Sequence, residues 1–182
     1  MPSPILIAAV LQLLLATTFV ALPVAVACRG AAAQQAAEAE VARQHGPTGT
    51  LAAHRIGFAE KPWEFCLAIG IAATLTTLAV LNLAGDETGR VLSWAIEPLI
   101  LVIVGFVCAS QALAARHTRT AFARSADPAV RALDADAVLR AAISILPPWV
   151  QPMVLLRFGL VTLGSPVVIV LLTLPSAGDY FR

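Results

Sequence analysis

Four long apolar stretches alternate with polar segments along the chain. They cover approximately residues 4–28, 63–83, 92–115 and 153–174. Each stretch is close to the roughly 20 residues that an α-helix needs to cross a hydrocarbon layer about 30 Å thick. The pattern predicts an all-α integral membrane protein, with a single transmembrane domain over residues 1–182 and a bundle of four helices.

The first apolar stretch also has features of a secretion signal. Ala25, Val26 and Ala27 resemble a signal-peptidase site, and Cys28 follows them as in a lipoprotein. The preceding residues MPSP include no Lys or Arg, however, and a lipoprotein signal prefers Leu or Val where Ala25 stands. We therefore expect this stretch to be retained as the first span.

The two longer polar segments, residues 29–62 and 116–152, are rich in residues that favour helices. The run RGAAAQQAAEAEVARQH ends at Gly46 and Pro47, which stop helices. The first helix is thus expected to extend about 15 residues, or roughly 22 Å, beyond the membrane. The third span is expected to continue in the same way.

A further helix is predicted to begin at Asp127, as its N-cap, with Pro128 at the first helical position. Asp136 and Arg140 have the spacing of an ion pair along one helix face. Asp134 interrupts the apolar stripe of this helix. We therefore expect the helix to face solvent or a partner rather than the membrane surface.

Composition agrees with a membrane location. Of the 182 residues, 59% are hydrophobic and 13% are charged, and the mean hydropathy is +0.84. The net charge of +1 gives no indication of nucleic-acid binding. Arginine greatly outnumbers lysine, which is typical of a GC-rich bacterial genome.

The basic residues divide unevenly between the two sides of the predicted membrane domain. The opposite side has Arg90 and Arg182, whereas the two long loops contain Arg29, Arg43, Arg55, Lys61, Arg116, Arg119, Arg124, Arg131 and Arg140. Short loops rich in Arg and Lys stay in the cytoplasm. We therefore expect a bacterial plasma-membrane protein with cytoplasmic long loops, and with both termini and residues 84–91 outside.

Aromatic and charged residues lie near the predicted span ends. Trp63 and Trp149 fall at the cytoplasmic boundary and Trp94 at the outer one, as interfacial anchors do. Arg157 lies about 6 Å inside the fourth span, where a long side chain can extend to the headgroups. We expect it to be another interfacial anchor; the alternative is an ion pair with Glu64 at the start of the second span.

Glu97 is followed by Pro98, a natural first residue of a helix. We expect this carboxylate to cap the third span near the outer interface rather than to carry protons. No ionisable residue is then expected near the bilayer midplane. Pro166 is expected to kink the fourth helix. The other small or polar residues expected in the interior are Gln12, Thr17, Thr18, Thr74, Thr76, Thr77, Gly164 and Ser165.

The two halves of the chain have a weak resemblance to each other. Cys28 and Cys108 lie near the ends of the first and third spans, and a Pro-Trp pair opens the second and the fourth. This pattern is consistent with a parallel two-plus-two repeat. Proline at helix starts and tryptophan at interfaces are common in any membrane protein, which is the alternative explanation.

The sequence contains no pattern of an enzyme or of a cofactor site. Its three cysteines form no CxxC pair, and its three histidines, His45, His54 and His117, all lie in the predicted cytoplasmic loops. We find no phosphate-binding glycine loop, nucleophile elbow or zinc-protease motif. We therefore expect no catalytic residues, cofactor or metal.

An accessory or assembly subunit of a larger plasma-membrane complex is the function that the sequence favours. The predicted interior lacks a polar path, and the helical loops are longer than a hairpin needs. We expect Arg116, Arg119 and Arg124 to contact other membrane subunits or anionic lipid headgroups. The alternatives are a small transporter or channel, and a membrane enzyme acting on a phosphorylated lipid-like substrate.

Overall fold

The computed structural model describes residues 2–178 and 180–181, with the side chains of all of these except 111 and 112. Every regular element in these ranges is a helix. Four helices are long and apolar enough to cross a membrane: Ser3–Arg43, Pro62–Ala84, Glu87–Ser110 and Val150–Thr173. The prediction of an all-α, multi-pass membrane protein is therefore confirmed.

The third and fourth spans each consist of two α-helices joined by a short π-helix. The elements in chain order are α1 (Ser3–Arg43), α2 (Thr50–Ala53), α3 (Pro62–Ala84), α4 (Glu87–Leu99), the π-helix η1 (Ile100–Val104), α5 (Gly105–Ala112), α6 (Ala114–Ala123), α7 (Pro128–Arg131), α8 (Ala135–Ile145), α9 (Val150–Gly159), the π-helix η2 (Leu160–Gly164), α10 (Ser165–Thr173) and α11 (Pro175–Gly178).

The chain divides into two compact units, and α1 contributes to both. The first, which we call the membrane unit, consists of Met1–Ala21, Cys66–Gln111 and Pro152–Arg182. The second, which we call the loop unit, consists of Leu22–Phe65 and Ala112–Gln151. The loop unit thus contains the two long polar segments.

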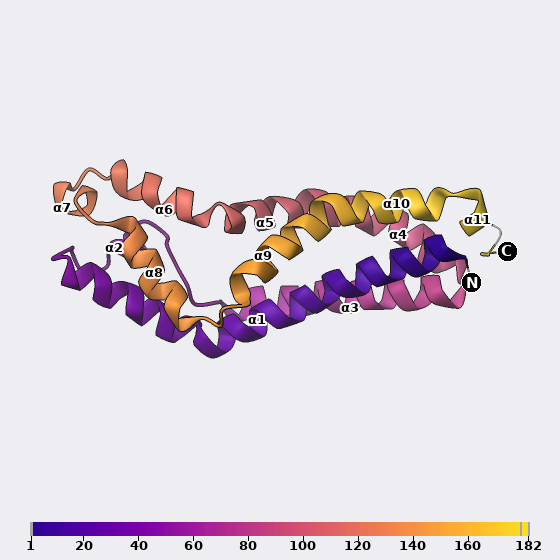
Figure 1. Cartoon of the computed structure of the whole chain (residues 1–182), viewed down its shortest axis with the longest axis horizontal. Helices are drawn as coiled ribbons and strands as arrows, with labels where there is room; N and C mark the ends of the chain where they lie inside the picture. Colours follow the sequence, from indigo (N-terminus) through magenta and orange to yellow (C-terminus); the bar gives the residue numbers. More distant parts are fainter. Residues whose placement is uncertain (1, 179, 182) are drawn as a thin grey trace. The chain divides into compact units, whose positions relative to one another are not determined.

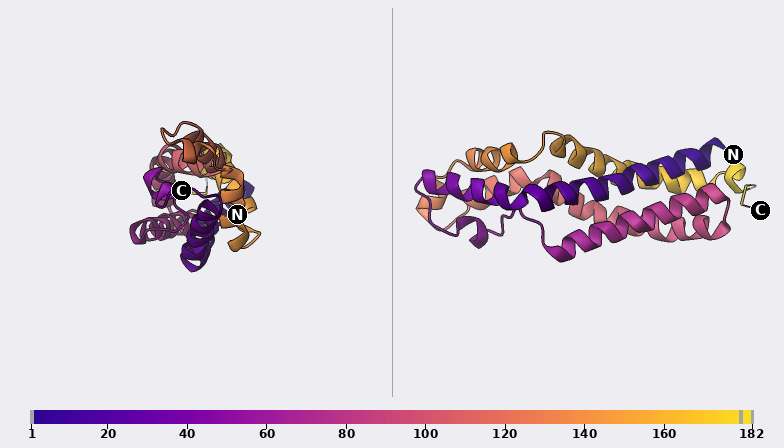
Figure 2. Two further views of the ribbon diagram at one scale, coloured as in Figure 1. Left: turned by 90° about the vertical axis from the view of Figure 1, so that its left-hand side faces the viewer. Right: turned by 90° about the horizontal axis from the view of Figure 1, so that it is seen from below.

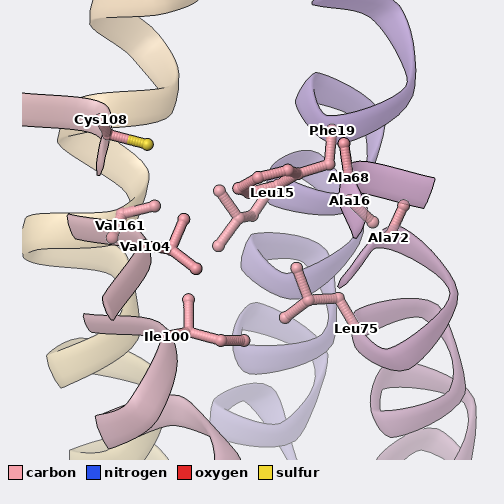
Figure 3. Packing of buried hydrophobic residues seen from close by; sticks show 10 residues of the cluster. All are labelled: Leu15, Ala16, Phe19, Ala68, Ala72, Leu75, Ile100, Val104, Cys108 and Val161. Carbon is pink, nitrogen blue, oxygen red and sulfur yellow. The ribbon is translucent and has the colours of Figure 1, made fainter. Parts of the chain in front are cut away.

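All four spans contribute to one apolar core of the membrane unit (Figure 3). Leu15 and Phe19 of α1 lie between Leu75 of α3 on one side and Ile100 and Val104 of η1 on the other. Other apolar side chains on the spans are exposed, such as Phe106 at 79%. These exposed side chains are suited to contact with lipid tails, because apolar groups are most stable away from water.

The chain reverses between α3 and α4 at Gly85 and Asp86 (Figure 2). Gly85 has a φ of 72°, which glycine adopts at little cost. Asp86 is the N-cap of α4, and its contacts with the hydroxyl and the N–H of Thr88 lower the pKa of this carboxyl. The third span therefore begins at Glu87, five residues before the predicted boundary, because the polar residues after Asp86 already belong to the helix.

Proline lies inside the helix in both spans that contain a π-helix. Pro98 lies just before η1, and Pro166 follows η2. A proline removes one N–H donor and its ring crowds the carbonyl four residues earlier, which disturbs the regular α-helical bonding. Proline alone does not account for the π-helices, because Pro23 lies inside α1, which has none. The ribbon changes direction between α9 and α10, as expected from the predicted kink at Pro166 (Figure 1). The two π-helices contact each other.

The loop unit has an apolar core of its own. Leu51, Phe122 and Val138 lie at its centre, together with alanines of α1 and α8. The predicted extension of the first helix is confirmed, since α1 runs to Arg43. The third span continues into α6 after a break at Leu113.

The predicted helix after Asp127 is in fact two short helices. Asp127 caps α7 as expected, but Asp134 caps α8 by accepting the N–H groups of Asp136 and Ala137. Asp134 therefore lies at a helix start, which explains why it interrupted the apolar stripe. The expectation that this helix faces solvent or a partner was wrong for its apolar face, which is buried in the core of the loop unit.

The predicted ion pair of Asp136 with Arg140 was also wrong. Asp136 Oδ1 accepts a hydrogen bond from Arg119 Nε at 2.7 Å, and Arg140 lies 3.5 Å from Asp134 Oδ2. The α6 helix packs against α8, which brings Arg119 to Asp136 from a separate part of the chain.

Candidate functional site

A cluster of five polar side chains lies inside the membrane unit, each at most 1% exposed. We call it the Glu97 cluster. It consists of Gln12 of α1, Asn82 of α3, Ser93 and Glu97 of α4, and Ser165 of α10. Polar groups are costly in an apolar interior unless they are hydrogen-bonded, so such a cluster is a candidate site.

Hydrogen bonds join three of these helices through two amides. The Gln12 amide nitrogen donates to Glu97 Oε1 at 3.0 Å and to Ser93 Oγ at 3.3 Å. The Asn82 amide nitrogen donates to Gln12 Oε1 at 3.2 Å and to Ser93 Oγ at 3.0 Å. The Ser93 hydroxyl donates to the carbonyl of Gly89 at 2.7 Å. Ser93 thus uses its hydroxyl both as an acceptor and as a donor.

The second oxygen of the Glu97 carboxyl, Oε2, accepts no hydrogen bond from the described residues. Within the described residues, Glu97 Oε2, Ser165 Oγ and Asn82 Oδ1 are buried without a hydrogen-bond partner. Ser165 lies beside the Glu97 carboxyl, but not with the geometry of a full hydrogen bond. Both line a pocket too narrow for a water molecule, together with Leu11, Gln12, Leu15, Leu160, Gly164 and Val168.

Glu97 lies deep within its span. It is ten residues after Glu87, which is about 15 Å along the helix axis, in a span of 24 residues. The expectation of a capping role for Glu97 before a helix start at Pro98 was therefore wrong. The expectation of a membrane interior without ionisable residues was also wrong. Both errors arose because the third span begins at Glu87, earlier than its hydropathy indicated.

Four of the five threonines expected in the interior donate hydrogen bonds to carbonyls of their own helices. The donor and acceptor pairs are Thr17 to Leu13, Thr18 to Leu15, Thr74 to Gly70 and Thr76 to Ala72. Of the residues that the sequence singled out, Gln12 and Ser165, expected in the interior, and Glu97, expected near the outer interface, are brought together. Asn82 and Ser93 were missed, since each lies near a span end where polar residues are unremarkable.

Arg157 is buried, at 6% exposure, within the membrane unit. Its guanidinium carbon lies 5.1 Å from the centroid of the Phe19 ring, and the side chain is also close to Cys108. The fourth span begins at Val150, so Arg157 is about 10 Å from that helix end rather than 6 Å. This burial differs from the expected extension toward headgroups.

The ion pair of Arg157 with Glu64, the alternative to an interfacial anchor, stays a prediction. Glu64 lies in the first turn of α3, where its Oε2 accepts the N–H of Lys61 at 3.1 Å. This hydrogen bond satisfies one of the free donors before the helix start.

The three tryptophans are exposed, as lipid or interfacial contact would require. The Trp94 ring also lies 4.6 Å from the Arg90 guanidinium carbon, and Arg90 Nε donates to the carbonyl of Leu172. Interfacial anchoring by Trp63, Trp94 and Trp149 stays a prediction.

The arginines expected to contact partners lie on or next to α6. Arg116, Arg119 and Arg124 are all exposed on the loop unit. In the part of the chain that the structure describes, no group of three His, Cys, Asp or Glu side chains is arranged to hold a metal ion. The three cysteines are free thiols, with Cys108 buried and Cys28 and Cys66 exposed.

No protein family, curated protein or solved structure matches this chain. Its class therefore follows from its own helices. It is a multi-pass membrane protein with a buried polar cluster between its spans.

Proposed function

We propose that this chain is a non-catalytic accessory or assembly subunit of a larger complex in the bacterial plasma membrane, with its four spans packed as a bundle. The loop unit supports this proposal most directly. Connections between neighbouring helices commonly need only 2–8 residues, whereas here they form a unit with an apolar core. Such a unit supplies a stable surface, with exposed arginines, for other membrane subunits and anionic headgroups.

The same proposal places the loop unit in the cytoplasm and both termini outside. Nine of the eleven basic residues outside Arg157 lie in the two long loops, which is the distribution of cytoplasmic loops. In intact cells, a membrane-impermeant thiol reagent is expected to label a cysteine placed at Thr88 and not one at Thr48 or Ala126. All three variants need a background without the native thiols. Labelling at Thr48 from outside would contradict the orientation.

Removing two positive charges from the α6 region is expected to weaken the subunit's association with its partner complex. The double variant Arg116→Ala, Arg124→Ala should reduce co-purification in a mild detergent by roughly tenfold, which corresponds to about 1.4 kcal/mol for two surface contacts. The control variant Arg29→Ala, Lys61→Ala removes two exposed charges elsewhere on the loop unit. Equal co-purification of both variants with the larger assembly would count against this docking surface.

A small transporter is the second candidate, because Glu97 is an ionisable group deep inside a span. Purified alone and reconstituted in liposomes, an accessory subunit is expected to move no ion or solute. Flux through the isolated chain that Glu97→Gln abolishes would instead support transport. This experiment separates the two proposals without knowledge of the partner.

The distribution of α- and π-helices among the spans does not support the predicted two-plus-two repeat. A parallel repeat would relate the first span to the third and the second to the fourth. The third and fourth spans each contain a π-helix, whereas α1 and α3 are α-helical throughout. We therefore leave the repeat out of the proposal.

A further inference from the structure

The Glu97 carboxyl is surrounded by neutral groups. Within the described residues, the Gln12 amide donates to its Oε1, and the Ser165 hydroxyl lies beside it without forming a full hydrogen bond. An ionised carboxylate that is removed from water loses a large hydration energy, which only a nearby cation, several donors or a proton can offset. One amide donor to Oε1 is a small compensation for a full charge.

The ionisable side chains elsewhere in the membrane unit are few. The part of α1 in this unit, both π-helices, α10 and α11 contain none. Arg90 lies on α4 but is directed to the carbonyl of Leu172 and the ring of Trp94. Arg157 of α9 lies over the Phe19 ring. The others in the described part of this unit are Cys66, Asp86, Glu87, Cys108 and Tyr180.

The free oxygen of Glu97 and the free hydroxyl of Ser165 lie on the same pocket. Both are at least 99% buried, and neither has a hydrogen-bond partner in the described part of the chain. A protonated acid has an O–H that can donate to a hydroxyl oxygen, and its other oxygen still accepts from the Gln12 amide. The Ser165 hydroxyl can itself donate to an ionised carboxylate, but that bond would leave the full charge buried. One proton instead neutralises the charge and gives Glu97 an O–H that can donate to Ser165 Oγ.

The size of the pocket favours a proton over a metal cation. It has no room for a water molecule, and four of its lining side chains, Leu11, Leu15, Leu160 and Val168, offer no oxygen. A hard cation such as Na⁺ needs several oxygen ligands around it. A proton needs only one carboxyl oxygen and no additional volume.

We propose that the Glu97 cluster is a proton-binding site within the membrane, in which Glu97 Oε2 holds the proton and donates it in a hydrogen bond to Ser165 Oγ. Binding forms the O–H bond from a carboxylate and a proton taken from water, and release restores both. The proposal is independent of the accessory role, because an assembly subunit and a transporter can each contain such a site.

Infrared spectroscopy of the full chain in lipid nanodiscs tests the proton directly. At neutral pH we expect the carbonyl band of a neutral carboxylic acid in the native protein and its complete loss in Glu97→Gln. Gln is the matched variant, since its amide has the shape of the protonated acid without the titratable group. Ser165→Ala should keep the band but change its frequency, because the acceptor for the acid O–H is gone.

Two controls make the result independent of how well the variants fold. Carbon-13 labelling of glutamate in the native protein must shift the same band, and transfer to D₂O must lower its frequency. Carboxylate bands in place of the acid band at neutral pH would overturn the proposal. Loss of the acid band on addition of Na⁺ at constant pH would overturn it as well, because the cluster would then be a metal-cation site.

Discussion

Gly89→Ala is expected to destabilise the membrane unit by about 2–3 kcal/mol, as overpacking of a well-packed interior does. An added Cβ would lie 2.6 Å from Leu81 Cβ and 2.9 Å from the backbone nitrogen of Asn82. Backbone atoms cannot rotate away, so α4 would have to move from α3. That movement would stretch the 3.0 Å hydrogen bond from Asn82 to Ser93.

Gly70→Ala is the matched control for this prediction. It makes the same change on α3, where a Cβ would meet nothing within 4 Å. We expect it to be neutral or to stabilise by up to about 1 kcal/mol, because alanine has less freedom to lose than glycine. Unfolding in mixed micelles, followed by tryptophan fluorescence, gives both free energies of unfolding. Equal values for the two variants would show that the close approach at Gly89 is not a constraint.

Phe122→Ala is expected to have the other large effect, a loss of about 3–5 kcal/mol from the loop unit. The side chain is 2% exposed in the core of this unit, and its ring packs edge-on against His54 at 6.0 Å between centroids. Truncation leaves a cavity between the elements that this ring joins. Because an isolated small domain has little stability in excess, we expect the loop unit to unfold locally.

Hydrogen exchange read peptide by peptide measures this loss. Protection should fall across the α6 and α8 segments in Phe122→Ala and should be retained in the apolar segments of the spans. Leu113→Ala, at a side chain that is 55% exposed in the same unit, should change stability by about 0.5 kcal/mol. Loss of protection throughout the chain in Phe122→Ala would mean that the loop unit does not unfold separately.

The Glu97 cluster changes how the rival functions compare. The sequence favours an accessory subunit partly because it predicts no ionisable group in the membrane interior. With Glu97 deep in the third span, that argument no longer holds, and the support for the accessory role comes from the loop unit instead. The infrared and liposome measurements are therefore complementary, because one detects a bound proton and the other detects its movement.

The sequence by itself determined the features that depend on neighbouring residues. Hydropathy over some 20 residues is enough to identify four spans, and Pro, Gly and Asp positions indicated the extension of the first helix and the cap at Asp127. The boundary of the third span was misplaced because GDETGR is polar and yet helical, with its N-cap at Asp86. The role of Asp134 was misinterpreted for a similar reason. An aspartate can lie inside a helix or act as its N-cap, and the local sequence does not distinguish the two positions.

Only the tertiary structure decided which distant residues meet. Gln12 bonds to Glu97 across a sequence separation of 85, and Asn82 bonds to Gln12 across 70. The burial of Arg157 against Phe19 likewise depends on which faces of two spans pack together. Local hydropathy carries no information about these pairings, because almost every face of an apolar helix is equally suited to lipid and to protein. The rotation of each helix about its axis is set instead by the packing and the polar contacts between spans.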